Sequence, residues 1–382
     1  MDQGYLQLHA GEDIPLAYVE LEGDIFLMAT SRNARWPSWI LRNGRCDVSI
    51  AGNRSAYMCR LVKDANQRKL ILDQFRKKYG SSRVNSWFAS DSRCIKLTPL
   101  NHEEVAAYEN NYFRWLEDEF DSIAEDYDNH IFGNSINAYL RERSVSLMVE
   151  AFRDHRTLLE IGCGSGTETI ELLRQGHQIV AIDISQQMLD VVKSKAIREG
   201  LQGQIELVKL RAGDVNSLIS MYGESHFDGI YSTYGAFNCE PDISSLASPL
   251  RRLIRTEGKM LLGIYNKACA LESIGYLIKG KPRKAFSRIH SKIMEGDSRF
   301  CVDTFPYTPW YVNKVFSPFF RVVRVIGVPV ILPPSNLAKY VQPFGSSMKT
   351  LKKIDTTIGR HWPFNLLGDH FLTLLEPMKE KS

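Results

Sequence analysis

The run LLEIGCGSGTETIELLRQG, residues 158–176, constrains the fold more than any other part of the chain. Apolar residues lead into three glycines, Gly162, Gly164 and Gly166, and a segment of helical character follows them. Glycine lets the backbone turn sharply and approach a ligand where any Cβ would obstruct it. This order predicts a buried strand, a tight turn and the start of a helix, which together form the βα unit of a nucleotide-binding domain.

The glycine spacing and one carboxylate narrow the choice of ligand. A dinucleotide-binding turn has its third glycine one position later than Gly166, so the spacing GxGxG disfavours NAD and FAD. Glu160 stands just before the glycines, where it would repel a pyrophosphate but would suit a ligand with a cationic amino group. The motif therefore predicts a nucleoside ligand that carries positive charge.

Further segments follow in the order of an α/β sheet. The apolar run QIVAID ends at Asp183, about twenty residues after the first glycine, where a second strand can deliver a carboxylate to ribose hydroxyls. Ser185 can then cap a helix with Met188 on its inner side. The segments IELVKLRAGD, HFDGIYSTYGAFN and GKMLLGIYN predict a third strand ending before Asp214, a fourth and a fifth.

With these motifs in this order and spacing, the chain resembles the class I S-adenosylmethionine-dependent methyltransferases of the small-molecule type. The resemblance implies an α/β fold, a Rossmann-like sheet of seven strands closed by HFLTLLEP, and methyl transfer from S-adenosylmethionine. It implies that Asp214 accepts from the adenine amine and that Val215 flanks the ring. Tyr127, in a segment that resembles the family's lid, either closes over the cofactor or packs within a helix. The candidate cofactor-binding residues are Glu160, Gly162, Gly164, Gly166, Asp183, Ile184, Met188, Asp214, Val215 and Tyr127.

The acceptor is predicted only as a small molecule, and methylation at oxygen, nitrogen or carbon stays open. Residues 267–309 and 333–364 exceed the minimal fold and are expected to form a substrate cap. A hydroxyl acceptor would need a base, for which His290 and, more weakly, His226 and His370 are candidates, but no catalytic residue is assigned. A basic cluster in the first insertion either holds an anionic group of the acceptor or is a solvated helix face. Its members are Lys279, Lys281, Arg283, Lys284, Arg288 and Lys292.

Residues 1–99 have the short alternations and turn residues of a small antiparallel β domain. With the stretch that begins WPSWILRNGRCDVSIAG, they resemble the split β-barrel of the flavin- and deazaflavin-dependent nitroreductase family. The resemblance implies FMN or a deazaflavin coenzyme, with its phosphate near Ser31, Arg32 and Asn33. Trp36 and Trp39 would lie beside it, or would form barrel core or a dimer seam.

The domain plan therefore has three parts. We expect a split β-barrel over residues 1–99, linker and lid helices over 100–150, and a methyltransferase domain over 151–382. One alternative makes the chain an oxidoreductase that acts through the barrel, with an accessory methyltransferase domain. The other makes the barrel a non-catalytic module that pairs to form a homodimer.

Composition sets limits on partners and location. The 382 residues are 44% hydrophobic and 24% charged, as in a globular protein, and the net charge of +4 gives no general attraction to nucleic acid or anionic membranes. The seven cysteines are scattered without a CxxC pair, so we expect reduced thiols and no metal. With no predicted signal peptide or membrane-spanning segment, we expect a cytoplasmic protein with no nucleic-acid or membrane partner.

Overall fold

The structure is a computed structural model that describes residues 5–10, 13–30, 34–89, 92–101, 112–290, 292–296, 301–340 and 347–379. The chain forms two compact units, and each is described here by itself. Unit 1 comprises Met1–Ile123 and Met294–Val302, and unit 2 comprises Ala124–Ile293 and Asp303–Ser382. The domain boundaries proposed from the sequence stay predictions.

Unit 1 contains a closed antiparallel barrel, as the sequence predicts. Its strands in spatial order are β1 (Tyr5–His9), β2 (Asp13–Leu21), β3 (Asp24–Met28), β6 (Cys94–Pro99), β5 (Asn53–Leu61) and β4 (Arg45–Ile50). Pairing of β1 with β4 closes the barrel and leaves no free sheet edge. Alternate residues point inward, so Leu6 and Leu8 of β1 are both buried in its core.

Helices accompany this barrel in unit 1, and the first of them adds Trp36 and Ile40 to the barrel core. They are α1 (Trp36–Asn43), α2 (Ala65–Tyr79), α3 (Ser81–Trp87) and α5 (Tyr112–Ile123). Helix α2 begins after Asp64, whose side chain accepts from the Gln67 N–H at 2.6 Å. Its Ile71 and Phe75 are fully buried. Residues 102–111, part of the predicted connecting helix, lie outside the described residues.

Unit 2 is built on a seven-stranded sheet, as expected for the predicted Rossmann-like fold. The order is β14 (Phe320–Val328), β15 (His370–Pro377), β11 (Ile254–Tyr265), β10 (Phe227–Ser232), β7 (Thr157–Ile161), β8 (Gln178–Asp183) and β9 (Ile205–Lys209). Strands β11, β10, β7, β8 and β9 run parallel, and β15 is antiparallel to both of its neighbours. The carboxyl ends of the parallel strands therefore meet at one edge, where ligands of open α/β sheets bind.

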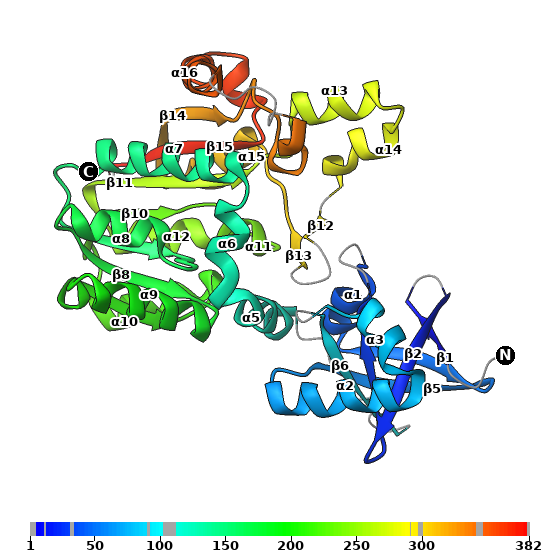
Figure 1. Ribbon diagram of the computed structural model, residues 1–382. Coiled ribbons are helices and arrows are strands. Elements are labelled where there is room, and N and C mark those ends of the chain that lie inside the picture. The colour runs from blue at the N-terminus through cyan, green and yellow to red at the C-terminus, as the bar shows by residue number, and fades with distance from the viewer. Residues whose placement is uncertain are drawn as a thin grey trace. The chain divides into compact units, whose positions relative to one another are not determined.

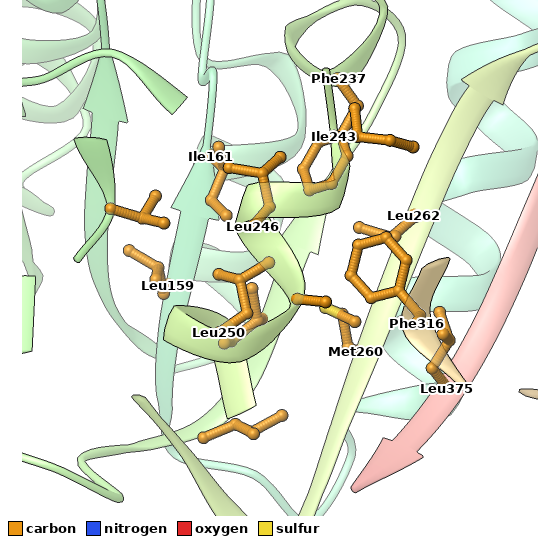
Figure 2. Close-up of a cluster of buried hydrophobic side chains, with 14 of the residues drawn as sticks. Leu159, Ile161, Phe237, Ile243, Leu246, Leu250, Met260, Leu262, Phe316 and Leu375 are labelled. Carbon is orange, nitrogen blue, oxygen red and sulfur yellow. The ribbon is translucent and has the colours of Figure 1, made fainter. Parts of the chain in front are cut away.

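Helices cover both faces of the sheet (Figure 1). One face carries α7 (Ser135–Ala151), α8 (Thr167–Arg174) and α9 (Gln186–Arg198). The other carries α10 (Ser217–Tyr222), α11 (Ala236–Cys239), α12 (Ala247–Leu253) and α15 (Pro309–Phe316). Figure 2 shows Leu246 and Leu250 lying over Leu159 of β7 in the second cluster. Because successive strand residues point to opposite faces, the run LLEI buries Leu158 in one cluster and Leu159 in the other.

The two insertions form additional elements. The first contains α13 (Ala270–Ile278), α14 (Pro282–Ala285) and the paired strands β12 (Ile293–Gly296) and β13 (Cys301–Thr304). The second contains α16 (Met348–Ile358). A further short helix, α6 (Tyr127–Phe132), precedes α7. Among the described residues, no helix combines the length and the apolar character needed to cross a bilayer.

A buried carboxylate attaches α16 to the end of β14. Asp355 is fully buried, and its Oδ1 accepts from the N–H groups of Val330, Ile331 and Leu332 at 2.8, 2.7 and 3.1 Å. Its Oδ2 accepts from the Tyr139 hydroxyl of α7 at 3.0 Å. One side chain thus satisfies three backbone donors that no strand partner serves.

Replacement of Asp355 by alanine is therefore expected to destabilise unit 2. It leaves buried N–H groups without an acceptor, at a cost of at least about 3 kcal/mol in the free energy of unfolding. Asp355→Asn keeps one acceptor oxygen facing the amides and should lose less than half of that. Urea denaturation followed by circular dichroism measures both variants, and equal stability of Asp355→Ala and the wild type would contradict the assignment.

Candidate functional site

The glycine motif forms the predicted strand, turn and helix. Strand β7 ends at Ile161, and α8 begins at Thr167. Gly162 and Gly166 have φ angles of +73° and +78°, which side chains rarely adopt. A Cβ on Gly162 would collide with Ala236, and one on Gly166 would lie 2.8 Å from Val192 Cγ2. Neighbouring elements therefore approach this loop so closely that only glycine fits.

Asp183 connects the loop to the next helix. The side chain is 7% exposed, its Oδ2 accepts from the Gly164 N–H at 2.8 Å, and its Oδ1 accepts from the Ser185 N–H at 2.9 Å. Ser185 is the N-cap of α9, as predicted, since its hydroxyl accepts from the Met188 N–H at 3.1 Å. A carboxylate oxygen has more than one acceptor site, so these bonds leave capacity for the hydroxyls of a bound ribose.

Glu160 lies beneath the loop. It is 2% exposed, and its Oε2 accepts from the Thr169 hydroxyl at 2.5 Å and the Tyr231 hydroxyl at 2.9 Å. Burial, together with the nearby negative charge of Glu168, raises the pKa of Glu160 to about 8. The hydrogen bonds of Glu160 therefore link β7, α8 and β10. Its role near a cationic group of the ligand stays a prediction.

Tyr127 lies against the glycine loop. A Cβ on Gly164 would lie 3.8 Å from Tyr127 Cε1, so the half-buried ring passes within van der Waals reach of the loop. Burial raises the pKa of Tyr127, so its hydroxyl stays neutral at physiological pH. Both interpretations of this residue, lid and helix packing, are compatible with that position.

Sequence reasoning missed Arg141, which orders the same region. Its Nη1 donates to both carboxylate oxygens of Glu168, at 2.7 and 2.8 Å, and its guanidinium lies 4.9 Å from the centre of the Tyr234 ring. The ion pair joins α7 to α8, and the aromatic contact links both helices to Tyr234, the second residue after β10. No spacing rule links these positions, because they come from three separate elements.

The predicted adenine side lies after β8 and β9. Ile184 is half-buried, and Met188 and Val215 are fully buried. Asp214 is exposed, and its Oδ1 accepts from Arg211 Nη2 at 2.9 Å. Next to it is a second residue that the sequence did not indicate: Glu240, whose Oε1 accepts from the Gly213 N–H at 2.9 Å.

The candidate histidines lie in different places. His226 precedes the first residue of β10 and so lies at the edge opposite the carboxyl ends, and His290 is exposed in the cap. His370 begins the antiparallel β15 and therefore lies at the carboxyl edge. Its ring centre is 5.3 Å from that of Tyr234 and 5.1 Å from that of Tyr265, and its Nδ1 is 3.2 Å from Asp369 Oδ2.

Tyr234 holds a strained backbone at this edge. Its φ of +48° is unusual for a residue with a side chain. The hydroxyl donates to the Leu140 carbonyl at 2.5 Å. The short helix α11 that follows is fixed by Asn238, which donates to the Phe305 carbonyl at 2.7 Å and accepts from the Tyr265 N–H at 2.9 Å. The aromatic residues beside His370 are thus held in place.

Arg288 differs from the rest of the predicted basic cluster. Its side chain is buried and forms ion pairs with Glu272 and with Asp369, the latter at 2.5 Å, while its guanidinium lies 4.1 Å from the centre of the Tyr265 ring. Burial opposes ionisation of Asp369, but Arg288 and His370 outweigh it and lower the pKa of that carboxyl. Cys269 completes a possible ligand set with these two carboxylates, although the guanidinium already supplies the positive charge.

In unit 1, the predicted flavin residues are described only in part. Ser31, Arg32 and Asn33 lie outside the described residues. Trp36 is 7% exposed in the barrel core, and the half-buried Trp39 packs against that core. Trp36 thus belongs to the barrel core, while a dimer seam at Trp39 and flavin binding stay predictions.

The buried Glu160 predicts a pH dependence of stability. Because its pKa rises from about 4.5 to about 8 on folding, the protonated form is favoured by the folded state. The associated stability is complete below pH 4.5 and is lost as the pH rises through 8, with a slope of up to about 1.4 kcal/mol per pH unit. Glu160→Gln should flatten this decline in urea denaturation, whereas Glu171→Gln, an exposed control in α8, should not. A free energy of unfolding of the wild type that rises between pH 4.5 and pH 8 would contradict the role assigned to Glu160.

Comparison with known proteins agrees with this geometry. Residues 159–262 match the family model described as a methyltransferase domain. The demethylmenaquinone methyltransferase of Bacteroides fragilis is 27% identical over 166 residues, which cover 42% of this chain and 64% of that protein. The tRNA 5-carboxymethoxyuridine methyltransferase of Escherichia coli is 26% identical over 175 residues, covering 43% and 65%. The chain thus spans less than two thirds of the length of either relative.

Among solved structures, the CcbJ methyltransferase from Streptomyces caelestis aligns with a TM-score of 0.46 and 11% identity, over 68% of this chain and 98% of that one. The sequence match lies on β7 to β11, the strands whose carboxyl ends carry the glycine loop and Asp183. Residues 159–262 of unit 2 thus match a methyltransferase domain, and they lie within a Rossmann-like sheet.

Proposed function

We propose that unit 2 transfers the methyl group of S-adenosylmethionine to a small-molecule acceptor. The observation that carries the proposal is Asp183, which lies at the carboxyl end of β8 and is bonded to both the glycine loop and the start of α9. S-Adenosylmethionine supplies a methyl group already activated on a sulfonium, so the protein chiefly has to align the acceptor and exclude water.

The residues around Asp183 fit the parts of this ligand. In the proposal Asp183 accepts from the ribose hydroxyls, and the apolar Ile184, Met188 and Val215 flank the adenine. Asp214 accepts from the adenine amine while it retains its bond to Arg211. The glycine loop, with Glu160 beneath it, and Tyr127 enclose the amino-acid end.

The acceptor is proposed to lie at the aromatic edge formed by Tyr234 and Tyr265. The relatives are named for acceptors as different as demethylmenaquinone and a tRNA nucleoside, so they do not select oxygen, nitrogen or carbon. For a hydroxyl acceptor, His370 is the candidate base, because it lies between the two tyrosine rings and Asp369 fixes one of its ring nitrogens.

For unit 1 we propose a non-catalytic module that pairs into a homodimer in the cytoplasm. The burial of Trp36 in the barrel core favours this role over the flavin- or deazaflavin-dependent oxidoreductase. An absorbance scan and light scattering of the purified full chain test it. A flavin spectrum would favour the oxidoreductase instead, and a monomer would contradict the pairing.

Calorimetric titration with S-adenosylmethionine and S-adenosylhomocysteine tests the methyltransferase proposal. The wild type is expected to bind both, and Asp183→Asn should weaken binding at least about tenfold, because the ribose loses a charged acceptor. Asp228→Asn is a matched control, since Asp228 also accepts from two backbone N–H groups, those of Arg156 and Thr157, but at the opposite edge.

The control variant should retain wild-type affinity. Circular dichroism shows whether each variant is folded at the temperature of the titration. Wild-type affinity in a folded Asp183→Asn protein would contradict the proposed role of Asp183, and a wild type that binds neither compound would contradict the function.

A further inference from the structure

Helix α13 has its polar side turned inward. Glu272 is 5% exposed and accepts from Asn336 Nδ2 at 2.7 Å. A Cβ on Gly275, one turn further along, would lie 3.5 Å from Leu337 Cδ1. The face of α13 that packs on the rest of unit 2 therefore carries a buried carboxylate and a glycine.

The opposite face of α13 is apolar and exposed. Ile274, Leu277 and Ile278, at i, i+3 and i+4, are 50%, 47% and 81% exposed. In the segment that follows, Phe286 and Ile289 are 50% and 63% exposed. Figure 1 shows α13 and α14 side by side and apart from the sheet, and the hydroxyl of Ser273 joins them by donating to the Ala285 carbonyl at 2.9 Å. The five exposed apolar residues are called the cap surface below.

Positive charges surround the cap surface. Lys279, Lys281, Arg283 and Lys284 are all exposed. The sequence from 270 to 290 contains one acidic residue, Glu272, which is buried beside Arg288. The surface therefore combines large apolar side chains with exposed lysine and arginine, even though the net charge of the whole chain is only +4.

We propose that the cap surface docks on an anionic lipid bilayer. Isoleucine, leucine and phenylalanine side chains gain free energy by entering the boundary between headgroups and acyl chains, and nearby lysine and arginine gain by contact with anionic headgroups. The mode of binding is peripheral, since no described helix can cross the membrane. The prediction of no membrane partner was based on the net charge of the whole chain. A net charge does not show whether positive residues are concentrated on one local surface.

Charge favours a bilayer over a second copy of the chain. A two-fold contact would place the same patch on both partners and so bring Lys281, Arg283 and Lys284 of one copy against those of the other. Such like-charge contacts are unfavourable, especially where apolar contact removes water. An anionic bilayer offers negative charge and hydrocarbon together.

Vesicle co-sedimentation of the full chain tests the proposal. The wild type should sediment with vesicles of phosphatidylcholine mixed with phosphatidylglycerol, and should stay in solution with phosphatidylcholine alone. Added salt should weaken binding, because the headgroup attraction is screened. Removal of each positive charge, in Lys281→Ala and Lys284→Ala, should lower the partition coefficient about fivefold.

The apolar half of the surface is tested by the double variant Ile278→Glu with Ile289→Glu. It should lose at least about tenfold in partition coefficient, because two carboxylates replace the inserting side chains. Ile197→Glu is the matched control, since Ile197 of α9 is 55% exposed elsewhere on unit 2. Retained S-adenosylhomocysteine binding and circular dichroism establish that each variant is folded, and a membrane result is independent of the methyl-transfer result.

Three outcomes would overturn the proposal. The wild type would stay in solution with anionic vesicles, or the double variant would bind them as the wild type does. The third outcome combines two results: light scattering shows an oligomer that dissociates in the double variant, and neither protein binds vesicles. The cap surface would then be an interface between proteins.

Discussion

The two backbone bonds of the Asp183 carboxylate hold together the part of unit 2 on which the proposed function depends. A glycine loop with positive φ angles is conformationally costly, and although the Ile182 carbonyl of β8 accepts from the Gly162 and Cys163 N–H groups, the Gly164 N–H needs another acceptor. Asp183 supplies one such acceptor to Gly164 and a second to Ser185, the first residue of the α9 cap. The group proposed to bind ribose is therefore also the group that orders the loop and the helix around it.

A second charged group, the Arg288 guanidinium, orders the region where the acceptor is proposed to bind. The buried Arg288 guanidinium pairs with Glu272 of α13 and Asp369 before β15, and donates to the Asn266 carbonyl after β11 at 3.0 Å. Each charge would be costly to bury alone, but the guanidinium offsets the negative charge of one carboxylate and forms an ion pair with each of the two. The cap is thus fastened to the same edge of the sheet that carries His370, so the geometry of the proposed acceptor site depends on the cap being folded.

The sequence predicted those features that depend on local patterns. The glycine turn, the Ser185 cap and the barrel strands follow from glycine spacing, capping chemistry and the alternation of apolar residues, whereas the seven-stranded sheet was implied by the family resemblance. The pairs Arg141–Glu168 and Arg288–Asp369 were not predictable in this way, because each joins residues from different elements and no periodicity connects them. For the same reason the basic cluster could be named from the sequence, but not the difference between the buried Arg288 and the exposed Lys281.

Helix α13 shows why an apolar pattern alone does not say which face of a helix is buried. Its sequence, ALESIGYLI, is mostly apolar, and burial of Ile274 and Ile278 would be expected from hydrophobicity. Burial of Glu272 becomes favourable only because Arg288 and Asn336 are already present as partners. Once Glu272 is fixed inward, the helical repeat places Ile274, Leu277 and Ile278 outward, where water is an unfavourable neighbour. The anchor that orders the cap is thus the cause of its exposed apolar face, and an apolar, negatively charged partner is the environment in which that face is most stable.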